Sequence, residues 1–243
     1  MSDLAMNPYE PELGSFPEVD SHGEAAVNKT GTTTVGVSTD EGVVIGTDRR
    51  ASLGGRFVSN KNVQKVEQIH PTAALTLVGS VGGAQSFIRT LRAEVNLYEA
   101  RRGKEMSMQA LATLAGNFAR GGPFLAINPI LGGVDVPRTS ARQTQSDDVD
   151  DGGSHVYSID PAGGVMEDDY AVTGSGMQLA HGTLEGEYDP SLSIEEAQDL
   201  VASAVYAASE RDTGSGNGLV VATVTSDGVE IESSDDPTEL LPA

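Results

Sequence analysis

The residues best suited to chemistry lie at one short junction, Thr30-Gly-Thr-Thr-Thr-Val-Gly36, where an irregular leader meets strand-forming residues. One interpretation is structural: β-branched threonines begin an exposed strand after a flexible glycine. The other is that the Gly31–Thr32 bond is a processing site. Cleavage there would leave Thr32 with a free amine beside its own hydroxyl, and an amine pKa of about 7.7–8.0 suits a built-in general base. Spacing alone leaves both interpretations open.

Other kinds of catalytic or binding site have little support in the sequence. The 243 residues include no cysteine, which excludes disulfides, thiolate metal sites and a cysteine nucleophile. The four histidines are isolated and lack metal-ligand spacing. Neither a phosphate-binding loop nor a strand-linked Gly-x-Gly-x-x-Gly is present. We therefore expect no metal site and no nucleotide site.

The charge of the chain excludes two classes of partner. Acidic side chains number 36 against 15 basic ones, a formal net charge of −21, which would repel nucleic acid and anionic membranes. No apolar run reaches the roughly 18 residues of a membrane helix, and the N-terminus lacks signal-peptide features, so we expect a soluble, cytoplasmic protein. Only four of the cations are lysines, and short carboxylates in place of lysine stems suit a high-salt cytoplasm.

The elements that must position this chemistry begin after the leader. Residues 1–31 show no sustained period and are predicted to be disordered. Short runs of strand type follow, bounded by Gly, Asp or Pro, and cover residues 33–38, 43–47, 72–79, 129–135 and 155–160. Between the last two, residues 136–153 are acidic and aperiodic, which indicates an exposed loop or insertion.

Apolar residues at helical spacing predict two consecutive helices, over about 84–98 and 108–118. A further helix is expected to begin near Met177. The capping box Ser193-Ile-Glu-Glu196 then predicts the start of a last helix, which should end near Arg211.

A final hairpin over residues 219–231 is predicted to turn at Asp227-Gly228, and residues 232–243 are interpreted as an acidic tail. The strands are grouped in runs and do not alternate singly with helices. This order favours an α+β fold of antiparallel sheets with helices layered on them.

Eight short stretches, in order along the chain, resemble the β subunit of the archaeal proteasome core particle. They are Gly31-Thr-Thr-Thr-Val-Gly-Val37, Gly46-Thr-Asp-Arg-Arg50, Asn62-Val-Gln-Lys-Val66, Val78-Gly-Ser-Val-Gly-Gly-Ala-Gln85, Gly132-Gly-Val-Asp135, Tyr157-Ser-Ile-Asp-Pro-Ala-Gly-Gly164, Val172-Thr-Gly-Ser-Gly176 and Glu210-Arg-Asp-Thr-Gly-Ser-Gly216. One such stretch would be weak evidence, whereas eight exceed what a generic N-terminal-nucleophile hydrolase would share. The resemblance implies a four-layer αββα sandwich and a threonine endopeptidase.

The resemblance also implies the catalytic residues. Thr32 would be the nucleophile after self-cleavage at Gly31–Thr32, with Asp48 and Lys65 as its partners and the backbone N–H of Gly79 as oxyanion hole. The lysine cation would lower the pKa of the amine, and the carboxylate would anchor that lysine. On sequence alone these could be a solvated lysine, a strand-end acid and a turn glycine. Three further positions are expected to surround and orient the amine: Ser175, Asp212 and Ser215. Arg50 corresponds to a structural charge near the site.

The specificity pocket of the family corresponds to four apolar residues, which by themselves are only core candidates: Ala51, Val63, Leu77 and Val81. As pocket linings they predict a hydrophobic residue on the acyl side of the cleaved bond. The expected organisation is a propeptide, 1–31, removed from a catalytic domain, 32–243. The insertion at 136–153 and the long acidic leader depart from the family and leave local ring contacts open.

The partners implied by the resemblance are other β subunits in a seven-membered ring, rings of α subunits that cap it, and a ring-shaped ATPase that feeds unfolded proteins into a closed chamber. No metal or organic cofactor is expected, because nucleophile, base and oxyanion hole come from the chain. Two alternatives are a non-catalytic ring component whose leader is never removed, and an amidase of small amides with the same N-terminal-nucleophile fold.

Overall fold

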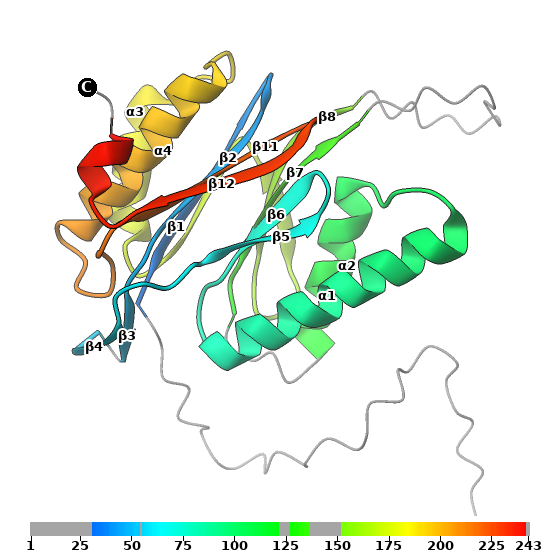
Figure 1. Cartoon of the computed structure of the whole chain (residues 1–243), viewed down its shortest axis with the longest axis horizontal. Helices are drawn as coiled ribbons and strands as arrows, with labels where there is room; N and C mark the ends of the chain where they lie inside the picture. The colour runs from blue at the N-terminus through cyan, green and yellow to red at the C-terminus, as the bar shows by residue number, and fades with distance from the viewer. Residues whose placement is uncertain (1–30, 54, 122–126, 137–151, 242–243) are drawn as a thin grey trace, which may run out of the picture.

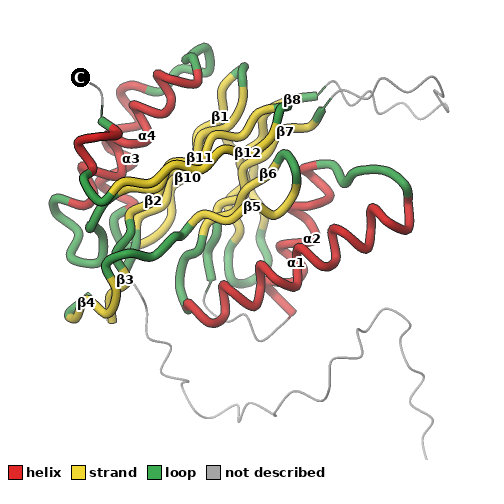
Figure 2. Tube along the Cα trace, in the orientation of Figure 1, coloured by secondary structure: helices red, strands yellow, loops and turns green. Residues whose placement is uncertain are grey.

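The computed structural model describes residues 31–53, 55–121, 127–136 and 152–241. Within them, two five-stranded antiparallel sheets stack face to face, and a pair of helices covers the outer face of each sheet (Figure 1, Figure 2). This arrangement confirms the expected four-layer αββα sandwich. The predicted leader, apart from Gly31, and residues 137–151 of the predicted loop lie outside the described residues.

The first sheet brings distant parts of the chain together at one end. Its strand order is β10 (Tyr170–Gly174), β1 (Thr33–Thr39), β2 (Gly42–Asp48), β11 (Leu219–Thr225) and β12 (Gly228–Ser234). Thr33 pairs with Gly174, and Leu219 pairs with Asp48. The start of β1, the ends of β2 and β10 and the start of β11 therefore share one end of the sheet.

The second sheet has the order β5 (Val66–His70), β6 (Ala73–Thr76), β7 (Ile130–Asp135), β8 (Gly153–Ile159) and β9 (Val165–Asp168). A separate hairpin of β3 (Ala51–Leu53) and β4 (Phe57–Asn60) links the sheets along the chain. Since β8 begins at Gly153, the structure corrects the end of the loop predicted over 136–153. Gly153 and Ser154 pair with Asp135 and Val134 of β7, so the ladder extends into the predicted loop.

Three apolar clusters hold the layers together. One lies between the sheets and includes Val43, Ile45 and Ile130. Another packs α1 (Val81–Arg102) and α2 (Met108–Gly121) on the second sheet, and the last packs α3 (Met177–Glu187) and α4 (Ile194–Ser209) on the first. The sandwich therefore has a core at each of its three layer boundaries.

Helix α4 begins at the predicted capping box. The Ser193 hydroxyl accepts from the N–H of Glu196 at 3.3 Å, and the Glu196 carboxylate accepts from the N–H of Ser193 at 2.9 Å. These two bonds confirm the predicted start of the helix.

The C-terminal residues depart from the predicted acidic tail of 232–243. Strand β12 continues to Ser234, and a 3-10 helix follows over Pro237–Leu240. Leu240 and Leu241 pack against the cluster under α3 and α4. The acids alternate along β12 because it is an edge strand with an exposed face, so the chain belongs to the fold through residue 241.

Candidate active site

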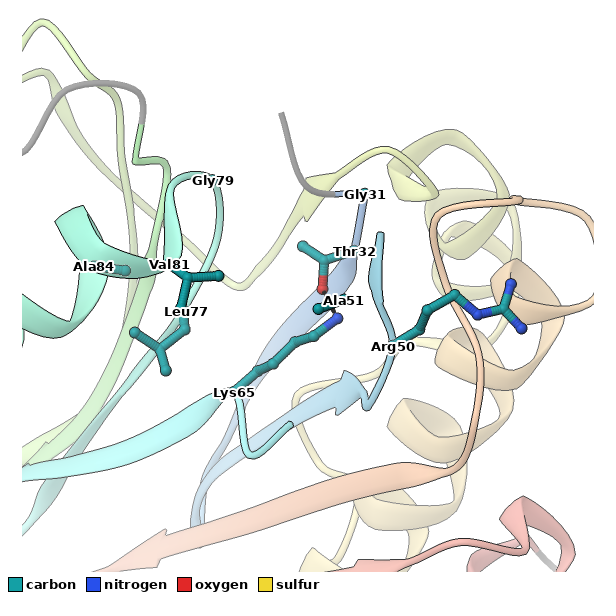
Figure 3. A pocket seen from close by; sticks show the side chains of 9 residues that line it. All are labelled: Gly31, Thr32, Arg50, Ala51, Lys65, Leu77, Gly79, Val81 and Ala84. Carbon is teal, nitrogen blue, oxygen red and sulfur yellow. Dashed lines mark hydrogen bonds between the residues drawn. The ribbon is translucent and has the colours of Figure 1, made fainter. Parts of the chain in front are cut away.

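Thr32 lies at the shared end of the first sheet, immediately before β1, with only 2% of its surface exposed. It opens onto a pocket whose lining comes from both sheets, from the β3–β4 hairpin and from the start of α1: Gly31, Thr32, Arg50, Ala51, Lys65, Leu77, Gly79, Val81 and Ala84. Figure 3 shows Lys65 pointing towards Thr32 and Arg50 pointing away, with Leu77 and Val81 on the opposite side of the pocket.

The hydroxyl of Thr32 is in contact with both of its expected partners. It donates to Asp48 Oδ1 at 2.8 Å and accepts from Lys65 Nζ. Lys65 Nζ also donates to the same carboxylate oxygen at 2.7 Å. A hydroxyl held between an amine and a carboxylate, all three buried, is the geometry of an activated nucleophile.

The carboxylate of Asp48 is fixed by the backbone around it. Oδ1 accepts from the N–H of Thr33 at 3.0 Å, and Oδ2 accepts from the N–H groups of Arg50 and Gly216, each at 2.9 Å. A buried carboxylate is costly unless its oxygens are hydrogen-bonded, and here both are. Its position therefore depends on three segments of the fold as well as on Lys65.

The pKa of Lys65 is lowered from its ordinary value of 10.5. Burial is the largest cause, because desolvation disfavours the charged ammonium. The charge of Asp48 and its hydrogen bond act in the opposite direction, without reversing the shift. The amine that touches the Thr32 hydroxyl thus loses its proton at a lower pH than a free lysine does, since burial lowers its pKa.

A network of hydroxyls reaches the nitrogen of Thr32 through Ser175. The N–H of Thr32 donates to Ser175 Oγ at 3.1 Å, and Ser175 in turn donates to Asp212 Oδ2 at 2.5 Å. Ser215 donates to the same carboxylate oxygen at 2.6 Å and lies 2.7 Å from the hydroxyl of Thr33. The three residues expected to orient this nitrogen therefore form one connected network.

Arg50 holds the loop that carries Asp212 and Ser215. Its Nε donates to Asn217 Oδ1 at 2.9 Å, and its Nη1 donates to the carbonyl of Thr213 at 3.1 Å. The guanidinium is turned away from the pocket (Figure 3). These contacts agree with the structural charge expected at this position.

Gly79 and three of the four expected pocket residues line the cavity. Gly79 has φ +96°, a conformation that favours glycine, and forms an isolated bridge with Ile127. The same pocket is lined by Ala51, Leu77 and Val81, together with Ala84 of α1. Val63 is not part of this lining: it lies between β4 and β5 and donates its N–H to the carbonyl of Arg49.

Sequence reasoning missed three residues at the site. Ala84 lines the pocket, Ser52 contacts Gly31, and Gly214 packs against Gly31. Gly214 lies inside a stretch that carried the family resemblance, which was a usable signal. Ala84 likewise lies inside such a stretch, at Val78–Gln85, whereas Ser52 carries no motif or unusual spacing that would have marked it.

No three His, Asp or Glu side chains in the described ranges are grouped so that they could hold a metal ion. The same residues contain no helix long and apolar enough to span a membrane.

Comparisons with known proteins identify the family of the chain. The proteasome subunit family matches residues 28–142 and 146–224. Similar proteins named proteasome subunit beta come from Halomicrobium mukohataei, 70% identical over 97% of this chain and 94% of the relative, and from Halorhabdus utahensis, 70% identical over 98% and 99%. Proteasome subunit beta 1 of Haloarcula marismortui is 67% identical over 96% and 91%. The chain therefore belongs to the proteasome subunit family, as a β subunit of the haloarchaeal type.

Proposed function

We propose that the chain is a catalytic β subunit of the proteasome core particle, a threonine endopeptidase whose nucleophile is Thr32 after self-cleavage of the Gly31–Thr32 bond. The observation that carries the proposal is the convergence of Lys65 Nζ and Asp48 Oδ1 on the Thr32 hydroxyl beside an apolar pocket.

The first step is removal of the leader. In the intact chain the nitrogen of Thr32 is an amide and cannot accept a proton. Lys65 is the amine that contacts the hydroxyl, and burial lowers its pKa, so neutral Lys65 takes the proton as the hydroxyl attacks the carbonyl carbon of Gly31. In the tetrahedral intermediate the nitrogen of Thr32 is no longer an amide and takes the proton from Lys65. The bond between Gly31 C and Thr32 N then breaks, and water hydrolyses the resulting ester.

The second step is cleavage of substrates by the same hydroxyl. Lys65 takes the proton of the Thr32 hydroxyl as its oxygen attacks the scissile carbonyl, and the N–H of Gly79 stabilises the oxyanion. The leaving amine takes the proton, and water hydrolyses the acyl-enzyme ester. The new terminal amine of Thr32 is held by Ser175, which Asp212 orients through a hydrogen bond.

The lining of the pocket sets the preferred residue on the acyl side. Ala51, Leu77, Val81 and Ala84 present apolar surface, and an unpaired charge placed against it costs several kcal/mol. Peptides cut after Leu, Phe or Tyr are therefore better substrates than those cut after Arg or Asp.

The relatives' names place them in proteasomes, and we extend this assembly to the present chain. The β subunits form a seven-membered ring capped by α subunits, and a ring-shaped ATPase delivers unfolded proteins to the enclosed threonines in the cytoplasm. A net charge of −21 opposes association at low ionic strength, so the rings need concentrated salt to screen it.

Two substitutions at Thr32 test the proposal against its alternatives. Thr32→Ser keeps a hydroxyl and is expected to retain cleavage of unstructured polypeptides, whereas Thr32→Ala loses it. A non-catalytic ring component would be inactive in all forms, including wild type. An amidase would turn over small amides only and would leave polypeptides intact.

A further inference from the structure

The residue before the scissile bond is held in a specific site of its own. The N–H of Gly31 donates to the hydroxyl of Ser52 in β3 at 3.0 Å, and Ser52 is only 1% exposed. Gly31 also packs directly on Gly214: a Cβ on Gly31 would lie 2.4 Å from the Cα of Gly214, and the reverse substitution would leave 2.5 Å. Backbone packed this closely fixes the position of Gly31 as well as its hydrogen bond.

The scissile bond is therefore held on both sides. On its amine side, the N–H of Thr32 donates to Ser175, and the Thr32 hydroxyl contacts Asp48 and Lys65. On its acyl side lies Ser52. In the part of the chain that the structure describes, the Ser52 hydroxyl bonds to Gly31 and to none of Thr32, Asp48 and Lys65.

We propose that Ser52 is a positioning residue for self-cleavage, and that it acts before the leader departs and not afterwards. The inference rests on the proposed function. An anchored N–H restricts rotation of Gly31, which keeps its carbonyl carbon within reach of the Thr32 hydroxyl. A displacement of about 1 Å between the reacting atoms can lower the rate by about 10²-fold. Once the Gly31–Thr32 bond is cut, Gly31 leaves and the Ser52 hydroxyl loses this partner.

The step that Ser52 supports is the acyl shift. The bond between Gly31 C and Thr32 Oγ1 forms as the bond between Gly31 C and Thr32 N breaks, and the hydroxyl proton reaches that nitrogen through Lys65. Water then hydrolyses the ester to a Gly31 carboxylate and free Thr32. Ser52 exchanges no proton in this sequence, so its effect is confined to geometry.

The test compares Ser52→Ala with Ser59→Ala in the full chain. Ser59 lies on the partner strand β4 and donates its hydroxyl to the carbonyl of Ala51 at 3.0 Å, so it controls for loss of a hydroxyl from the same hairpin. Intact mass over time gives the rate of cleavage, and peptidase activity is divided by the amount of cleaved subunit.

We expect Ser52→Ala to slow cleavage by about tenfold to a hundredfold, with activity per cleaved subunit within about twofold of wild type. Ser52→Thr, which keeps the hydroxyl, and Ser59→Ala should cleave at nearly the wild-type rate. If Ser52→Ala does not cleave at all, rescue by Ser52→Thr at an unchanged thermal midpoint supports the same role.

Three results would overturn the inference: normal cleavage in Ser52→Ala, equal losses of cleavage and of activity per cleaved subunit, or a lowered thermal midpoint with no rescue by Ser52→Thr. Failure of the proposed function itself gives a different result. In that case wild type would keep its leader, or Thr32→Ala would lose it.

Discussion

The two sides of the candidate active site differ in polarity and in burial. The side around Thr32, Asp48 and Lys65 is buried and polar, and its hydrogen bonds reach β1, β2 and the loop before β11. The opposite side, with Leu77 and Val81, is apolar, and Val81 is 45% exposed at the start of α1. Under the proposed function, the reaction takes place where many hydrogen bonds fix the geometry, and substrate selection takes place where a side chain can change without disturbing those bonds.

The sharpest test of the polar side is Lys65→Arg. Arginine keeps the charge but stays protonated, so it cannot accept the hydroxyl proton. We expect self-cleavage and peptidase rate to fall by about 10²–10⁴-fold, while Lys61→Arg, at an exposed lysine nearby, leaves both unchanged. Intact mass and a fluorogenic peptide assay measure the two. Activity within tenfold of wild type in Lys65→Arg would remove lysine as the base.

The pH dependence of self-cleavage follows from the same residue. In the proposed self-cleavage, neutral Lys65 is the reactive form, and burial lowers its pKa from the ordinary value of 10.5. The rate should therefore rise with pH, by up to about tenfold per unit below that pKa, and level off before 10.5. Time courses of intact mass in buffers of different pH provide the profile. A rate that falls with rising pH would contradict this assignment.

Asp48→Asn should cost both activity and stability. The substitution leaves Lys65 without its buried counter-charge, and removal of one partner of a buried pair costs about 3–5 kcal/mol, less here because lysine can lose its proton. We expect about 10²-fold slower cleavage and a lower thermal midpoint. Asp235→Asn neutralises an exposed carboxylate that pairs with the largely buried Arg49, and it should change little because the carboxylate is well solvated. Equal cleavage rates and equal thermal midpoints in Asp48→Asn and Asp235→Asn would contradict the role given to Asp48.

Ser175→Ala should have a smaller effect. It removes the acceptor for the N–H of Thr32 but leaves the contacts of the Thr32 hydroxyl with Asp48 and Lys65 in place. The expected loss in peptidase rate is about tenfold, the cost of one charge-assisted or orienting bond. Steady-state kinetics on a fluorogenic peptide measures it, and a loss as large as that of Lys65→Arg would show that Ser175 does more than orient.

On the apolar side, Ala51→Leu should alter preference and leave the chemistry intact. The larger side chain adds three carbons and fills part of the pocket, and a single methylene already changes discrimination by about tenfold or more. We expect cleavage after Tyr to fall relative to cleavage after Ala. Val63→Leu, outside the lining, is the matched control and should leave the ratio unchanged. A shifted ratio in Val63→Leu, with none in Ala51→Leu, would reverse the assignment of the pocket wall.

The sequence predicted the polar side better than the apolar side. Thr32, Asp48 and Lys65 lie in stretches whose order along the chain identifies the family, and the fold brings them into contact. The sequence does not decide whether Val63 lines the pocket, because the direction of its side chain depends on the conformation of the link between β4 and β5. Ser52 is a lone serine in the sequence, and only the folded structure shows that its hydroxyl accepts a hydrogen bond from the N–H of Gly31.

The C-terminus teaches a related point. Its acidic residues suggest a solvated tail. In the structure, the acidic side chains of β12 alternate with less exposed residues, and Leu240 and Leu241 beyond the strand pack against the apolar cluster under α4. Local composition does not report contacts made with distant elements.

We propose that Thr32 is both the N-terminal residue exposed by self-cleavage and the nucleophile. Intact mass of the assembled protein, wild type beside Thr32→Ala, tests it most directly. The account predicts a wild-type chain that begins at Thr32 and a Thr32→Ala chain that keeps residues 1–31. The same cleavage in both chains, or an intact leader in an active wild-type enzyme, would contradict it.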